Sequence, residues 1–154
     1  MAKISEEICV SKPAEEVFAY LADFRNERDW NSAARDVRLL TPGPISAGSR
    51  FEHLEQAPPP FGACLITTEV AEWSPGKVIR FHHASVTPPW EATWQYRLRA
   101  DGVGTKIMID IDMRGSGVLR PLMPLMAPFI RRFRFRPSFT RLAEALERLE
   151  SPRS

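Results

Sequence analysis

A strict alternation of apolar and polar side chains between residues 90 and 114 is the feature that most constrains the fold. Along residues 90–98 one parity carries Trp90, Ala92, Trp94, Tyr96 and Leu98, and the other carries polar side chains. Residues 107–113 repeat the pattern, with isoleucine or methionine at every second position. Successive side chains of a strand point to opposite faces of a sheet, so both segments predict strands with one buried and one hydrated face. The buried face needs a cover.

Similar patterns predict strands at residues 3–11, 35–40, 50–55, 63–73 and 77–84, besides 90–99 and 105–114. Turn residues rich in proline and glycine separate the later strands, which favours antiparallel pairing of neighbours. A helix is expected to begin near Pro13, because proline and the acidic Glu15 and Glu16 suit a first helical turn. A second short helix is expected at residues 24–30.

The cover is predicted at the C-terminus, where the chain has helical periodicity from Gly117 to about Leu149. Apolar residues recur there at helical spacing: Met126, Phe129, Ile130, Phe133, Leu142, Leu146 and Leu149. Prolines at 121, 124 and 128 are expected to break or kink the beginning of this helix, and Pro137 its middle. We therefore expect an irregular first portion and a regular portion from Phe129.

Composition limits the class of protein. The 154 residues suit one domain, residues 1–154, and a formal net charge of +2 gives no reason to expect nucleic acid as a partner. The two cysteines, Cys9 and Cys64, are expected to be reduced core residues. The first seven residues lack the apolar core of a signal peptide, and residues 121–130 are too short to span a bilayer. We expect a soluble, cytoplasmic protein, with monomer and homodimer both open.

The order strand, two short helices, six strands and long helix resembles the START/birch-pollen-allergen (SRPBCC) superfamily, in particular its polyketide cyclase/dehydrase-like branch. The stretches that carry the resemblance are residues 14–23 with Trp30, residues 48–51, residues 69–77, Gly104-Thr105 and the final amphipathic helix. Together they cover essentially the whole chain.

This resemblance implies an α+β helix-grip fold, in which a curved antiparallel seven-stranded sheet (β-α-α-β6-α) wraps around a long C-terminal helix and encloses a hydrophobic pocket. Members of the superfamily include lipid and hormone binders, aromatase/cyclases and chaperone-associated proteins. No catalytic residue is carried over, because no invariant catalytic motif is available to transfer.

A helix laid across a curved sheet cannot touch the whole concave face. A dry void of about 300 Å³ would cost about 7 kcal/mol, comparable to the stability of a whole domain, so water, a ligand or bulky side chains must fill it. We predict a site for a hydrophobic, lipid- or polyketide-like small molecule; the alternative is that the same side chains fill the interior themselves. The predicted ligand-binding residues are Phe51, Phe81, His83, Trp90, Trp94, Tyr96, Ile109, Ile111, Met113, Met126, Phe129 and Phe133.

An enzyme of the polyketide cyclase/dehydratase type is the alternative function. His53 and His83 share the parity of inward-facing residues and are the candidates for a catalytic acid or base, or for hydrogen-bonded wall residues. His82 points to the opposite face from His83, so the two cannot share a metal ion. No metal site and no cofactor are predicted, since the sequence has no metal-spaced Cys/His set, no glycine-rich phosphate loop and no nucleophile elbow.

The basic run from Arg131 to Arg136 leaves three interpretations. The arginines cover the sheet rim with their heads in water, or Arg132 or Arg136 contacts an acidic ligand, or the helix is a module that binds a partner or a membrane surface.

Overall fold

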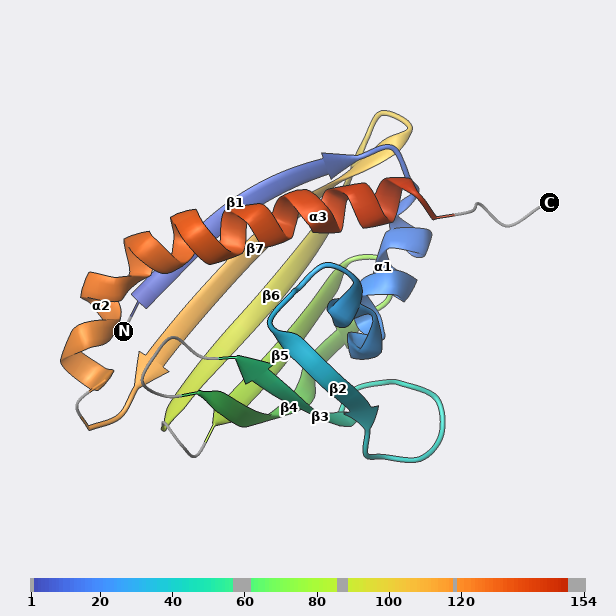
Figure 1. Ribbon diagram of the computed structural model, residues 1–154. Coiled ribbons are helices and arrows are strands. Elements are labelled where there is room, and N and C mark those ends of the chain that lie inside the picture. Colours follow the sequence, from blue (N-terminus) through green and yellow to red (C-terminus); the bar gives the residue numbers. More distant parts are fainter. Residues whose placement is uncertain (1, 57–61, 86–88, 118, 150–154) are drawn as a thin grey trace.

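The structure is a computed structural model that describes residues 2–56, 62–85, 89–117 and 119–149 (Figure 1). Its elements are β1 (Ala2–Val10), α1 (Ala14–Ala22), the 3₁₀ helix η1 (Phe24–Asp29), β2 (Ala34–Leu39), β3 (Arg50–Gln56), β4 (Ala63–Ser74), β5 (Val78–Ser85), β6 (Trp90–Asp101), β7 (Gly104–Gly115), α2 (Leu119–Ile130), the π-helical turn η2 (Arg131–Phe135) and α3 (Arg136–Glu147).

The strands form one antiparallel sheet in the order β1-β7-β6-β5-β4-β3-β2. Neighbours in the sheet are neighbours along the chain except for β1, which pairs with β7 in a register that sets Ile4 opposite Ile111. Figure 1 shows the long C-terminal helix crossing the concave face of this sheet, with α2 beside the start of β1 and the end of α3 near α1. The predicted α+β helix-grip fold, with its seven strands, is confirmed.

The alternation in β6 and β7 forms the core as the sequence predicts. Tyr96, Ile107 and Ile109 are buried on the concave face, together with Leu142 and Leu146 of α3. At the same end α1 buries Phe18, whose ring meets Trp73 edge-on at 5.0 Å between centroids. This end of the sheet is therefore closed by packed side chains.

Gly104 and Thr105 join the start of β7 to the link between β1 and α1. A Cβ at Gly104 would lie 2.2 Å from the carbonyl oxygen of Val10, so only glycine fits there. The Thr105 hydroxyl donates a hydrogen bond to the Lys12 carbonyl at 2.7 Å. The pair fixes β1 and β7 as neighbours, and with them the closure of the sheet at this edge.

The C-terminal helix departs from the sequence prediction. The expectation of an irregular first portion is wrong, because α2 is α-helical through Pro124 and Pro128. Both prolines are exposed and lie one turn apart, so the carbonyls that lose a helical donor are on the side facing solvent. The expected kink near Pro137 is instead the π turn η2, which ends just before it and relieves the ring clash that an α-helical path would create.

The cysteine prediction is half right. Cys9 and Cys64 are both free thiols, but only Cys64 is buried. Cys9 lies on the parity of β1 opposite to Ile4, Ile8 and Val10, which faces away from the core.

Candidate ligand cavity

A cavity of about 570 Å³ lies where the sheet is covered by α2 and η2 rather than by α3. Its walls come from β3 to β7 on one side, from η1 on a second side and from α2 and η2 on the third. The volume falls within the range of about 300–1,000 Å³ that small-molecule sites occupy.

The structure divides the residues that we predicted to bind a ligand into two groups. On the cavity wall lie His83, Trp90, Trp94, Met113, Met126, Phe129 and Phe133. In the packed core, outside the residues that line the cavity, lie Phe51, Phe81, Tyr96, Ile109 and Ile111. For the strand residues of both groups, strand parity gave the inward face correctly, but it does not show which part of the sheet is closely covered by helices.

An aromatic cluster bounds the cavity on the side of the packed core. The Trp94 indole meets the Phe135 ring edge-on at 5.1 Å and the Phe139 ring at 6.0 Å. Trp30 also packs against Phe139, with 6.2 Å between the ring centroids. These contacts close the space beneath α3 and leave the space beneath α2 open.

The mouth of the cavity lies along α2 and η2. Leu125, Phe129 and Phe133 line the cavity, yet they are exposed by 70%, 66% and 68%. Side chains that both line a cavity and face solvent mark the place where it opens.

Glu27 is a buried carboxyl on the cavity wall, only 7% exposed. It lies in η1 between the buried Phe24 and Trp30, and residues three apart eclipse one another in a 3₁₀ helix, so it is held on the inward face. The Asn31 amide donates to one of its carboxylate oxygens at 3.0 Å. Burial raises the pKa of Glu27 to about 7, against the opposing effects of that hydrogen bond and of the Arg134 charge.

His53, Glu55 and Arg134 form a second polar group on the same wall. Nε2 of His53 lies 3.1 Å from a Glu55 carboxylate oxygen, and Glu55 is also ion-paired with Arg134. Burial and the nearby Arg134 charge lower the pKa of His53 to about 4, so the imidazole is neutral at neutral pH. With its proton on Nε2 facing the carboxylate, Nδ1 is an acceptor, and it is buried without a partner among the described residues.

His83 is also buried and neutral, because desolvation lowers its pKa. Its Nδ1 lies 2.7 Å from the hydroxyl of Thr68, and the Phe24 ring packs against both His83 and His53 at centroid distances of 5.3 and 5.1 Å. His82 is outside this group, as strand parity predicts.

Glu27, Asn31, Glu55 and Arg134 also line the cavity, and the sequence patterns did not identify them. A signal for Glu27 was present, since it stands three residues from an aromatic residue on each side. Arg134 is the arginine that lines this cavity, whereas Arg132 and Arg136, which we named as possible partners of an acidic ligand, line a smaller groove. The π turn changes the angular position of its residues, which the usual helical period does not anticipate.

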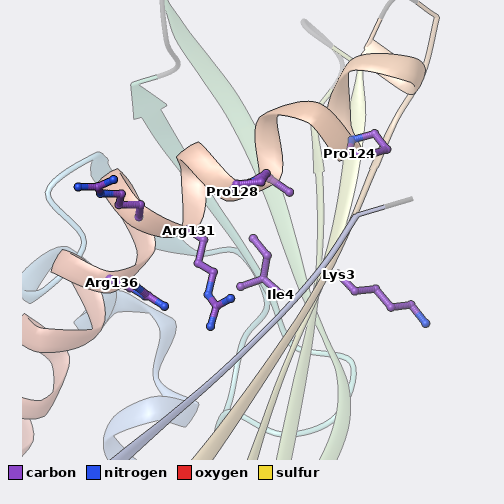
Figure 2. A pocket seen from close by; sticks show the side chains of 8 residues that line it. Lys3, Ile4, Pro124, Pro128, Arg131 and Arg136 are labelled. Atoms are coloured by element: carbon purple, nitrogen blue, oxygen red, sulfur yellow. The ribbon is translucent and has the colours of Figure 1, made fainter.

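A smaller groove of about 420 Å³ lies on the other side of the helix, between α2 and the start of β1. Figure 2 shows Arg131 and Arg136 reaching from the helix toward β1, whereas Lys3 points away. Both arginines contact the Glu6 carboxylate, at 2.5 and 3.3 Å, and so tie the helix to β1.

In the part of the chain that the structure describes, no group of histidine, cysteine, aspartate and glutamate residues is placed to hold a metal ion. No helix among the described residues is long and apolar enough to cross a membrane.

Glu27 is expected to make the stability of the fold depend on pH. The pKa is about 7 in the folded chain against an ordinary 4.5, so the folded chain holds a proton that the unfolded chain releases between these values. The free energy of unfolding therefore falls as the pH rises through this window. Glu27→Gln keeps an acceptor for Asn31 and should be more stable than the natural chain by about 3 kcal/mol near pH 8, with no difference near pH 4.

Urea unfolding at the two pH values measures this difference, with Glu91→Gln on the exposed face of β6 as the control. The same difference at both pH values would contradict a buried carboxyl that titrates near neutrality.

Comparison with known proteins places this geometry in a family. The family described as polyketide cyclase / dehydrase and lipid transport matches residues 1–147. No curated protein matches the sequence significantly. Similar solved structures include a conserved protein from Geobacillus kaustophilus (TM-score 0.73, 11% identity, 94% of each chain covered) and Ara h 8.0201 (TM-score 0.66, 10% identity, 94% of this chain and 96% of that chain).

DynU16, from the dynemicin biosynthetic locus, is similar over 96% of this chain and 48% of its own (TM-score 0.62, 17% identity). At these identities the structures show the fold alone, whereas the family match spans nearly the whole sequence. The chain therefore belongs to the polyketide cyclase / dehydrase and lipid transport family of the SRPBCC superfamily.

Proposed function

We propose that the protein binds a hydrophobic small molecule, lipid- or polyketide-like, that carries a hydrogen-bond donor. The observation that supports this most directly is an apolar cavity of about 570 Å³ lined by His53, whose Nδ1 is buried and has no hydrogen-bond partner among the described residues.

The apolar walls favour a ligand over water. Trp90, Trp94, Met113, Met123 and Met126 offer little hydrogen bonding to water molecules, which need two to four polar partners to be held in place. An apolar molecule would bury these surfaces at a gain of about 25 cal/mol per Å².

The polar wall defines what the ligand must carry. Nδ1 of His53 accepts but does not donate, and leaving such a group unpaired costs about 1–3 kcal/mol. A hydroxyl group on the ligand removes this cost, whereas an ether oxygen at the same place does not. Arg134 already has Glu55 as its partner, so a carboxylate on the ligand would have to compete with it.

A matched pair of ligands tests this account. A polycyclic phenol is expected to quench tryptophan fluorescence saturably, because two indoles line the cavity, and to bind about tenfold more tightly than its O-methyl ether. In His53→Phe the two ligands should bind within about twofold of each other.

His82→Phe, on the opposite face of β5, is the control and should keep the preference for the phenol. The proposal fails if no polycyclic ligand saturates the signal, or if His53→Phe leaves the preference unchanged.

Glu27 supports a second candidate function, proton-transfer catalysis of the cyclase or dehydratase kind. A general acid–base group works best with a pKa near the working pH, and burial brings the pKa of Glu27 to about 7. Ionised Glu27 would take a proton from the carbon beside a ketone. It would then return that proton to the β-hydroxyl that leaves as water, forming the conjugated double bond.

If the protein catalyses this reaction, Glu27→Gln should abolish water loss from a β-hydroxy ketone while changing the affinity for that compound by less than about threefold. Product is followed by the absorbance of the conjugated enone. Unchanged turnover in Glu27→Gln would exclude this role, and an absence of turnover in the natural chain would leave binding as the function.

A further inference from the structure

A row of large apolar side chains on α2 and η2 faces solvent. Leu122, Leu125, Phe129 and Phe133 are exposed by 43%, 70%, 66% and 68%, and their spacing of three and four residues places them on one face. The rings of Phe129 and Phe133 are stacked, 6.5 Å apart. This row is called the exposed stripe below. Elsewhere on α2 Met123 is buried and the helix packs on β1 and β7, so the stripe is not needed for the core.

The segment of the chain that carries the exposed stripe is strongly basic. From Met113 to Ala143 the sequence contains no aspartate or glutamate, but it contains arginines at 114, 120, 131, 132, 134, 136 and 141. Arg120 and Arg132 are exposed, and neither makes an ion pair with any described residue. The Arg132 guanidinium lies over the Phe133 ring, 5.4 Å from its centroid, and so joins the basic flank to the stripe.

The arginines of the smaller groove, on the other side of the helix, add to the positive charge of this segment. Arg131 and Arg136 share the single carboxylate of Glu6, which leaves one positive charge uncompensated between them. An apolar row bordered by arginines that have no acidic neighbours on their own helix is the pattern of a helix that lies at a lipid–water interface.

We propose that the exposed stripe and its flanking arginines dock the protein onto the surface of an anionic lipid bilayer. Leucine and phenylalanine would enter the boundary of the acyl chains, while Arg120 and Arg132 would meet the phosphate groups.

A second copy of the chain fits this surface poorly. Two copies joined through the stripe would bring the arginines of one against the arginines of the other, with no carboxylate on either helix face to pair them. An anionic bilayer complements both the apolar and the basic part of the surface.

The position of the cavity mouth favours a bilayer over a protein partner. Leu125, Phe129 and Phe133 belong to the exposed stripe and also line the mouth, so a protein seated there would seal the cavity. A bilayer would instead place the mouth against acyl chains, from which a hydrophobic ligand could enter. This step rests on the ligand binding proposed above, whereas the charge and exposure of the stripe do not.

Flotation of the full chain with vesicles tests the proposal. Vesicles of phosphatidylcholine with about one third phosphatidylglycerol should bind the protein, pure phosphatidylcholine vesicles should bind it much more weakly, and salt should release it. The double variant Arg120→Glu/Arg132→Glu should bind at least about 25-fold more weakly, from about fivefold per arginine lost. Phe129→Ser/Phe133→Ser should weaken binding by at least about tenfold.

The controls lie in the β6–β7 hairpin, at the other end of β7. Arg99→Glu and Val103→Ser, at exposed positions, should bind vesicles as the natural chain does. Circular dichroism verifies that each variant is folded.

The proposal is overturned if the chain does not float with anionic vesicles, or if the stripe and arginine variants float like the controls. It is also overturned if the stripe mediates a dimer or captures an acidic protein while vesicles do not bind.

Ligand titration of the Arg120→Glu/Arg132→Glu variant without vesicles separates the two proposals, because neither arginine lines the cavity. If the variant binds the ligand normally but no longer floats with vesicles, both proposals are supported. If the natural chain floats with vesicles but binds no ligand, only the proposed function is overturned.

Discussion

The structure depends on how the C-terminal helix covers an apolar sheet face that is wider than the helix. Along α3 the cover is complete, with Leu142 and Leu146 fully buried among the side chains of the sheet. Along α2 and η2 the cover is partial, and the aromatic cluster of Trp94, Phe135 and Phe139 marks the border between the two regions. One helix therefore stabilises the fold with its second half and leaves a cavity beneath its first half.

Electrostatics gives the cavity its chemical character. The desolvation that keeps His53 and His83 neutral also holds the Glu27 carboxyl partly protonated near neutral pH, so the polar wall carries less charge than its residue types suggest. Arg134 is balanced by Glu55 and lies close enough to Glu27 to affect its pKa. The result is a set of hydrogen-bonding groups rather than a site for one strong ion, which suits an apolar guest with a few hydroxyl or carbonyl groups.

The sequence was sufficient for the fold because alternation, turns and helical periodicity agree along nearly the whole chain. It was sufficient for the direction of His53 and His83, since strand parity is a local property. It was not sufficient for the limits of the cavity: Phe51 and Trp94 both face inward, and only the packing of η1 and η2 on the sheet decides that one is in the core and the other on the wall. Arg134 could not be identified, because its direction follows from a π turn, and Phe129 and Phe133 proved to lie at the mouth rather than against the sheet.

The central claim is that a hydrophobic molecule occupies the space beneath α2. Methyl NMR of the protein labelled at methionine tests it directly, because Met113, Met123 and Met126 line the cavity while Met108 lies on the outer face of β7. On addition of a saturating polycyclic phenol, the account predicts that the three cavity methyls shift and show contacts to the ligand, whereas Met108 does not change. Ligand contacts at Met108 without any at Met113, Met123 and Met126, or no change at any of the four, would contradict it.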